Sequence, residues 1–252
     1  MSLKRWFLYA GITATLIAFS GAMGAYGQAS STLTIQLGPQ SGQSIGVLSE
    51  APQGWGSDTS TAVLPFGNYV GPVSGHNIQT RSYLWFPLSS IPSAATVTAA
   101  RLEVYVNDWP YDGSAELGAY RVTGNWDESL TWGNRPAADN SPLVSTTVSS
   151  TVGWAAWQVT SLVQAWHGGA TNNGLMLGGA PLPDSLIGQG WAAAAVGRTA
   201  SDTAHAPRLV VTYRLPSPPA GPADVPEPGT ALLLGGGLAA LLAFIRLRQN
   251  RA

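Results

Sequence analysis

The stretch TVTAARLEVYV, residues 96–106, decides the fold of this chain. Apolar and polar residues alternate along it, which is the pattern of a strand with one buried face. Its apolar members are Val97, Leu102, Val104 and Val106. The alternation slips by one position near Ala99 and Ala100, where we expect a β-bulge. The stretch predicts a strand of an antiparallel sheet that packs on a hydrophobic core.

Short stretches with the same alternation recur on both sides, bounded by Gly, Pro, Asn and Ser. The expected strands are residues 32–37, 81–88, 96–106, 115–122, 143–148, 154–159, 174–177, 191–197 and 208–213. So many short strands with one short helix predict an all-β domain in which two antiparallel sheets pack as a single β-sandwich.

The predicted helix follows the 154–159 stretch. Thr160 or Ser161 is its expected N-cap, and a Gly-Gly pair ends it. Leu162 and Trp166 fall on one face, so we expect the helix to cover an open end of the sandwich. We expect three tryptophans around this helix to pack in the core rather than to bind a ligand. These are Trp154, Trp157 and Trp166.

Residues 1–29 have the pattern of a secretory signal peptide. Lys4 and Arg5 form a positive n-region, an apolar run follows, and small residues then allow cleavage after Gly27 or Ala29. The alternative is an N-terminal transmembrane helix.

The C-terminal end also has the composition of a targeting segment. Residues 215–224 predict a stiff Pro-rich linker, which separates the domain at 30–214 from an uncharged apolar stretch at 230–245. As a helix, this stretch would reach about 24 Å, against a hydrocarbon core of roughly 30 Å. Arginines behind it favour a cytoplasmic end. A C-terminal membrane anchor is one interpretation.

Pro226, Glu227 and Pro228, followed by the short apolar stretch and the Arg-rich end, resemble the PEP-CTERM sorting signal over residues 225–252. The resemblance implies processing by an exosortase-type membrane enzyme in a Gram-negative bacterium that makes extracellular polysaccharide. It also implies passage through the inner membrane, with the C-terminal helix in the membrane at least transiently. The final location would be the cell surface or the extracellular matrix.

Composition excludes several classes of function. The chain has no cysteine, so it has neither disulfides nor thiolate metal sites. Charged residues make up 10% of the chain, against roughly 25% in typical soluble proteins. Residues 30–215 hold seven arginines and eleven acidic residues, a formal charge of −4, which argues against a nucleic-acid partner. No Gly-rich loop opens a βα unit, so the sequence gives no support for a phosphate-binding site.

Several ordered segments resemble the DNRLRE domain family. They are residues 86–97 with 100–106, 122–136, 157–166 with 172–177, and 207–213, so the resemblance spans about 31–213. The hexapeptide that names the family is absent. The resemblance implies a jelly-roll sandwich on secreted and surface proteins and non-catalytic binding of carbohydrate, in some members of acidic polysaccharides such as alginate.

Two loops carry aromatic residues for which a core position is hard to argue. Sugars are recognised by an aromatic face together with a few placed polar groups. The candidate ligand-binding residues are Trp109, Tyr111, Trp55, Asp108 and Asp112. The alternative is that these rings pack over the edges of the sandwich.

The segment 126–136 carries two tryptophans and three charged residues. In one interpretation Arg135 pairs with Asp127 and Glu128, or binds a sugar carboxylate. In the favoured one, the tryptophans plug the sandwich and the charges cap the loop. Adjacent carboxylates on an extended chain point to opposite faces, which argues against a glycosidase.

We expect no cofactor and no catalytic residue. A structural calcium ion is left open, since six aspartates lie mostly in loops: Asp58, Asp108, Asp112, Asp139, Asp184 and Asp202. His76, His167 and His205 lack the spacing of a zinc site.

The sequence thus predicts an exported, non-catalytic protein that binds extracellular polysaccharide. The alternative is a purely structural envelope or biofilm component without a discrete ligand.

Overall fold

The computed structural model describes residues 29–50, 59–70, 77–108, 114–149, 151–179 and 190–217, together with 235–238, 240–242 and 244–246. Strands dominate the described domain. They are β1 (Ser30–Gln36), β2 (Gln43–Leu48), β3 (Thr59–Ser60), β4 (Val63–Val70), β5 (Asn77–Trp85), β6 (Thr96–Asp108), β7 (Ser114–Arg121), β8 (Val144–Ser149), β9 (Gly153–Gln158), β10 (Leu175–Gly178), β11 (Gly190–Val196) and β12 (Arg208–Arg214). The helices of the domain are α1 (Thr160–His167) and the short 3-10 turn η1 (Thr203–His205).

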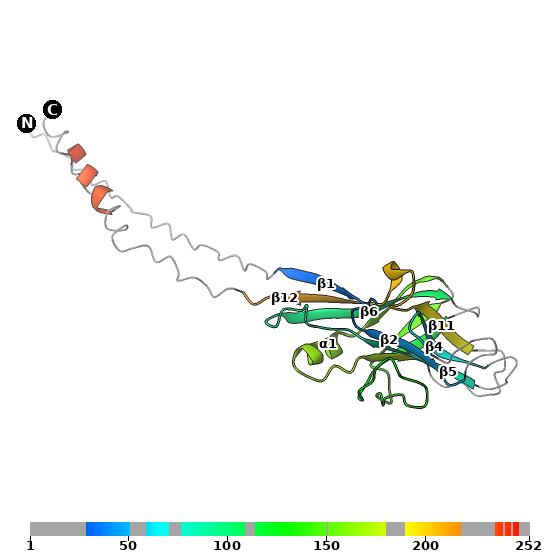
Figure 1. The fold of residues 1–252 in the computed structure, drawn as a ribbon. Coiled ribbons are helices and arrows are strands. Elements are labelled where there is room, and N and C mark those ends of the chain that lie inside the picture. The colour runs from blue at the N-terminus through cyan, green and yellow to red at the C-terminus, as the bar shows by residue number, and fades with distance from the viewer. Residues whose placement is uncertain are drawn as a thin grey trace, which may run out of the picture.

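The strands form two antiparallel layers, so the predicted all-β sandwich is confirmed. In the first layer β6 lies between β12 and β9, and β1 pairs with the outer side of β12. In the second layer β5 pairs with β2, β4 and β10, and β7 and β8 follow β10. Strand β11 joins the layers, because it pairs with β4 along its length and with the end of β6. Figure 1 shows β1 and β12 side by side at one end of the elongated domain.

The predicted bulge is present in β6, one position before the expected place. Val97 pairs with Tyr213 of β12, but the next pair in register is Ala99 with Thr212, so Thr98 is the extra residue. Thr98 and Ala99 both face solvent, which restores the inward orientation of the apolar residues that follow.

Two strands that the sequence did not predict, β2 and β4, contain residues that normally interrupt strands. Gly46 lies in β2, and Pro65 and Gly67 lie in β4. Gly46 fits here because a Cβ on it would lie 2.3 Å from Cδ of Pro65. The carbonyl of Pro65 accepts a hydrogen bond from the buried hydroxyl of Ser82, at 2.7 Å. Gly46 and Pro65, two residue types that normally interrupt strands, therefore pack against each other inside the sheet.

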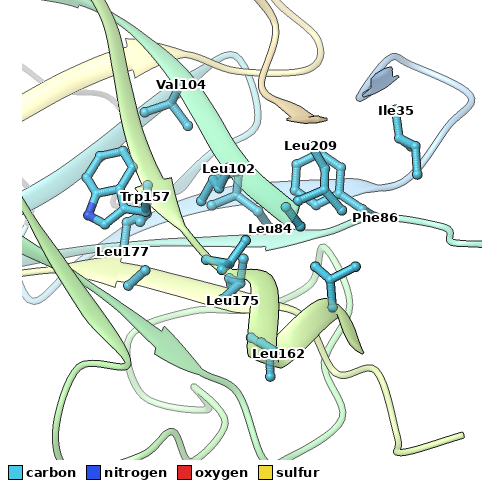
Figure 2. Packing of buried hydrophobic residues seen from close by; sticks show 14 of the residues in the cluster. Ile35, Leu84, Phe86, Leu102, Val104, Trp157, Leu162, Leu175, Leu177 and Leu209 are labelled. Carbon is cyan, nitrogen blue, oxygen red and sulfur yellow. The ribbon is translucent and has the colours of Figure 1, made fainter. Parts of the chain in front are cut away.

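The main core fills the space between the layers. Leu102 and Val104 of β6 and Leu209 of β12 face residues of the second layer such as Leu84 and Leu177, and all are buried. Figure 2 shows these side chains gathered between the strands, with α1 carrying Leu162 to the same cluster.

Trp157 is the largest fully buried side chain of this core, and its predicted burial is confirmed. It is 0% exposed, its indole N–H donates to the carbonyl of Leu117 at 2.7 Å, and its ring meets Phe66 edge-on at 6.0 Å. Trp154 was expected in the core as well, and that expectation is wrong, since its exposed fraction is 36%. Residues three apart in a strand lie on opposite faces, so Trp154 faces outward where Trp157 faces inward.

Helix α1 has its predicted buried face, but its N-cap prediction is wrong. Leu162, Val163 and Trp166 are buried. The N-cap residue is Val159, which makes no side-chain capping bond. Thr160 lies inside the helix, and its hydroxyl instead accepts a hydrogen bond from the backbone N–H of Ala100 at 3.0 Å. The hydroxyl that suggested a cap therefore ties the helix to β6.

The C-terminal segment is described only in part. Residues 235–238, 240–242 and 244–246 are helical and exposed. Among the described residues, no helix has the length and apolar character needed to cross a membrane. The sorting residues Pro226, Glu227 and Pro228, the first 28 residues and linker positions 218–224 lie outside the described residues.

Candidate functional site

The outer face of the second layer is apolar and is covered by a long loop. Ile45 and Val47 of β2, Tyr83 of β5 and Met176 of β10 form a second hydrophobic cluster on this face. Residues 122–143, which we call the covering loop, pack onto it. The loop brings Val122, Trp126, Leu130, Trp132 and Ala138 to the cluster. The expectation that both tryptophans plug the sandwich is met in part, because each is half-buried and lies outside the main core.

A nearly buried ion pair ties the covering loop to the domain. Nε of Arg198 donates to Oε1 of Glu128 at 2.5 Å, and the second nitrogen of the same guanidinium contacts Oε2. Arg198 also donates to the carbonyl of Pro39 at 2.8 Å, and only 10% of its side chain is exposed. The hypothesis that Arg135 is the partner of Glu128 is therefore wrong, because Arg198 satisfies both carboxylate oxygens.

Asp127 has a local capping role, as the favoured interpretation expected. Its Oδ1 accepts from the backbone N–H of Ser129 at 2.8 Å and from the Ser129 hydroxyl at 2.5 Å. These hydrogen bonds lower the pKa of the Asp127 carboxyl below its ordinary value. The carboxylate is thus used to form a turn of the covering loop.

Two tryptophans line an open hollow where the covering loop meets the ends of β5 and β10. The hollow has a volume of about 270 Å³. Its lining residues are Gln43, Trp85, Asn125, Trp126, Asn172 and Asn173. A second hollow of about 200 Å³ shares Asn125 and Trp126 with the first, and we call the two together the tryptophan hollow.

Backbone carbonyls fix both indole rings of the tryptophan hollow. The N–H of Trp85 donates to the carbonyl of Asn172 at 3.0 Å, and that of Trp126 donates to the carbonyl of Asn173 at 2.7 Å. Gly174 makes this turn possible: its φ is +83°, and a Cβ there would lie 2.3 Å from the carbonyl oxygen of Leu84. The rings are therefore held in place before any ligand arrives, which lowers the entropic cost of binding.

Two guanidinium groups lie close to the ring of Trp132, which packs on the outer face of the second layer. Cζ of Arg135 lies 4.1 Å from the ring centroid, and Cζ of Arg81 lies 5.8 Å from it. Arg81 donates to the amide oxygen of Asn68 at 3.1 Å and to that of Gln79 at 3.2 Å. Burial lowers the pKa of Arg81, although the group remains charged.

Among the described residues, no carboxylate forms an ion pair with Arg81 or Arg135. The two positive charges beside Trp132 are therefore not neutralised within the described part of the chain. A guanidinium without a carboxylate partner in the protein can form an ion pair with the carboxylate of a ligand.

The ligand-binding residues expected from the sequence are not tested by the structure. Trp55, Trp109, Tyr111 and Asp112 lie outside the described residues, and Asp108 is described only through its backbone, as the last residue of β6. The strands that precede the two loops, β2 and β6, run in the same direction, because four antiparallel pairings separate them.

The tryptophan hollow was missed by sequence reasoning, which placed Trp85 only within an expected strand at residues 81–88. Two signals pointed to it. Trp85 has the same parity as Arg81 along β5, so both belong on the outer face. The Asn172-Asn173-Gly174 sequence is typical of a tight turn, which brings polar groups beside a strand end.

No group of three metal-ligating side chains occurs among the residues that the structure describes. His205 contacts Asp202 through Nδ1 at 2.6 Å, and His167 contacts the carbonyl of Ala95 at 3.1 Å. His76 and three of the six loop aspartates (Asp58, Asp112 and Asp184) lie outside the described ranges, so the calcium hypothesis stays untested.

Two family models match the chain. The model of carbohydrate-binding module family 96 matches residues 49–212. The chain belongs to carbohydrate-binding module family 96. The matched range contains the covering loop and every residue of the tryptophan hollow except Gln43. Residues 224–249 match the PEP-CTERM protein-sorting motif, which indicates export to the cell surface or the extracellular space of a Gram-negative bacterium. No curated protein matches the chain.

Proposed function

We propose that this protein is an exported, non-catalytic component of the cell surface or extracellular matrix that binds extracellular polysaccharide in the tryptophan hollow. The observation that carries the proposal is the pair of fixed indole rings, Trp85 and Trp126, set among side-chain amides in an open hollow. Aromatic faces pack against the C–H face of a sugar ring, and amides bond its hydroxyls.

The size of the hollow suits part of a chain rather than an enclosed ligand. The first of the two hollows has a volume of about 270 Å³, which is near the lower end of the range for small-molecule sites, roughly 300–1,000 Å³. The second, adjoining hollow extends the surface past Trp126 to Asn134. A polysaccharide that runs across both hollows would contact the protein through a few sugar units.

The charge beside the hollow favours an acidic polysaccharide. Arg135 follows Asn134 of the second hollow, and its guanidinium has no carboxylate partner among the described residues. A uronic acid held at Trp126 would place its carboxylate next to this cation. Salt should therefore weaken the binding of a polyuronate.

The roles of the nearby carboxylates support binding without catalysis. Asp127 caps a turn and Glu128 neutralises Arg198. Glycoside hydrolysis needs two carboxyl groups that face one bond across ~5–9 Å, and both groups here have other partners.

Affinity electrophoresis of the full-length protein through gels that contain a polyuronate or a neutral polysaccharide tests the proposal. We expect the polyuronate to retard the wild type and Trp126→Ala to weaken this retention about tenfold or more. Trp109→Ala and Trp55→Ala test the alternative that the two aromatic loops, with Tyr111, Asp108 and Asp112, form the site. If no polysaccharide retards the wild type, the structural envelope component is the better description.

Export and processing need a separate measurement. We propose that an exosortase-type enzyme recognises Pro226, Glu227 and Pro228 while the C-terminal segment is held in the inner membrane. Mass spectrometry of the protein from fractionated cells should find it at the surface or in the matrix. An intact polypeptide that remains in the cytosol would contradict the localisation.

A further inference from the structure

The outer face of the first layer carries a cluster of three aromatic rings that lies outside the hydrophobic core. Tyr105 of β6 and Trp154 of β9 are paired across the sheet, and their ring centroids lie 5.5 Å apart, edge to face. The imidazole of His205 stacks on Tyr105 at 3.8 Å and lies 5.9 Å from Trp154. We call these three side chains the ring platform. An outward sheet face is usually polar, so this cluster calls for a reason.

Charged neighbours hold the ring platform in one arrangement. The guanidinium of Arg208 lies 3.9 Å from the ring centroid of Trp154, and its Nε donates to Oε2 of Glu103 at 2.6 Å. Arg101 donates to the other oxygen of Glu103 at 2.5 Å. On the far side of the platform, Asp202 contacts Nδ1 of His205 at 2.6 Å. The rings are therefore positioned by a network and not by burial.

Trp154 keeps both surface and a donor for a ligand. Its exposed fraction is 36%, while Trp157 on the inner face of the same strand is fully buried. The indole N–H groups of Trp85, Trp126 and Trp157 each donate to a backbone carbonyl. The N–H of Trp154 has no such acceptor within the described part of the chain. A fixed, exposed indole with a free donor is the form of a recognition group.

The charges around the ring platform balance one another. Arg101 and Arg208 both pair with Glu103, and Asp202 pairs with His205, so two guanidinium groups and two carboxylates lie around the rings and each carboxylate is already paired. This differs from the pair of unneutralised arginines beside Trp132. A platform without excess charge has no attraction for an acidic polysaccharide, but its rings and N–H donors fit the C–H face and hydroxyls of an uncharged sugar.

We propose that the ring platform is a second carbohydrate site, which takes a neutral polysaccharide chain. The main core separates it from the tryptophan hollow, because the hollow lies on the outer face of the second layer and the platform on the outer face of the first. One molecule then holds two chains on opposite faces and cross-links them. This inference extends the proposed function, and its test keeps the two sites apart.

The experiment uses the full-length protein and four variants: Trp126→Ala, Trp154→Ala, the double variant and Trp154→Phe. Each is run in affinity gels that contain either a polyuronate or a neutral glucan, mannan or galactan. We expect Trp154→Ala to lose about tenfold in retention by a neutral polysaccharide and to keep retention by the polyuronate. Trp126→Ala should show the reverse. Trp154→Phe, which keeps a ring but not the N–H, should be intermediate.

Cross-linking supplies the second measurement. The wild type mixed with a polyuronate and the retained neutral polysaccharide should raise light scattering, and neither single variant should do so, since each holds one chain only. A cooperative thermal unfolding transition of Trp154→Ala, only slightly below that of the wild type, shows that the fold is intact.

The outcomes separate the two claims. If Trp154→Ala is retained by neutral polysaccharides like the wild type, or if none of them retains the wild type, the platform inference is overturned. If Trp126→Ala keeps full retention by the polyuronate, the proposed function of the hollow is wrong while the platform stands. If Trp126→Ala alone abolishes retention by every polysaccharide, the molecule has one site.

Discussion

The two outer faces of this sandwich use tryptophan in different ways. On the second layer, the covering loop buries an apolar face, and the indole N–H groups of Trp85 and Trp126 are bound by backbone carbonyls of one turn. On the first layer Tyr105 and Trp154 come from paired strands, and His205 of η1 stacks on Tyr105. Arg208, paired with Glu103, contacts Trp154 from the sheet itself. The first arrangement depends on the covering loop staying in place, and the second depends on three paired strands and on the short turn η1 that carries His205.

A ring can therefore be held ready for a ligand in two different ways. The tryptophan hollow should be lost when the covering loop is released, even if the sandwich stays folded. The ring platform should survive that release.

Trp157→Ala should be the most damaging substitution, because Trp157 lies in the core between the two faces. It removes a side chain that is 0% exposed and leaves the carbonyl of Leu117 without its donor. We expect a loss of about 3–5 kcal/mol in the free energy of unfolding, measured by urea denaturation. Trp154→Ala is the matched control on the same strand; it loses the ring contacts with Tyr105 and Arg208 and should cost about 1–2 kcal/mol. Equal losses in both variants would contradict the assignment of the inner and outer faces.

Glu128→Gln should damage the covered face alone. The change removes the charge that pairs with Arg198, whose side chain is 10% exposed, and releases the loop that carries Trp126. We expect a loss of about 2 kcal/mol in the free energy of unfolding and weaker retention by a polyuronate.

Two controls accompany this variant. Asp139→Asn breaks a more exposed pair with Arg121 and should cost under about 1 kcal/mol. Retention of Glu128→Gln by a neutral polysaccharide should not change, and a parallel loss there would show that the two faces are coupled.

The smallest effect is expected when the pH is lowered and Glu103, which lies beside the ring platform, becomes protonated. Burial raises the pKa of Glu103, but the hydrogen bonds from Arg101 and Arg208 outweigh it, so the pKa is lowered overall. A lowered pKa in the folded state stabilises the protein fully above the ordinary value of about 4.3. This contribution is lost as the pH falls through the folded-state pKa. The difference in free energy of unfolding between wild type and Glu103→Gln should be constant from pH 7 to about pH 5 and shrink below about pH 4. A difference that grows on acidification would contradict this sign.

The sequence predicts the fold of this protein better than its site. The alternation in β6 and β12 gave both strands within two residues and nearly located the bulge, because each strand has one buried face. Strands β2 and β4 were missed because Gly46, Pro65 and Gly67 resemble turn residues until their mutual packing is known. Local pattern cannot show that a breaker is matched by its neighbour in space.

The site could be predicted only in part, since it is formed by contacts far apart in sequence. Trp85 and Asn172 are brought together by pairing of β5 with β10, and Glu128 of the covering loop meets Arg198, which is 70 residues away in sequence. Residue type alone placed Trp154 in the core, although its position three residues before Trp157 argued for the opposite face. Family resemblance, in contrast, predicted the class of ligand that the family match supports.

The position of β12 has a mechanical consequence. This last strand of the domain is hydrogen-bonded on both sides, to β1 and to β6, along Arg208–Arg214. Suppose that a polysaccharide is bound elsewhere on the domain and that a force acts on the C-terminal end of the chain. This force is then transmitted to the domain through β12. Its bonds on both sides must then shear together instead of opening one after another. The domain is therefore built to resist force from the direction in which its C-terminal segment leaves it.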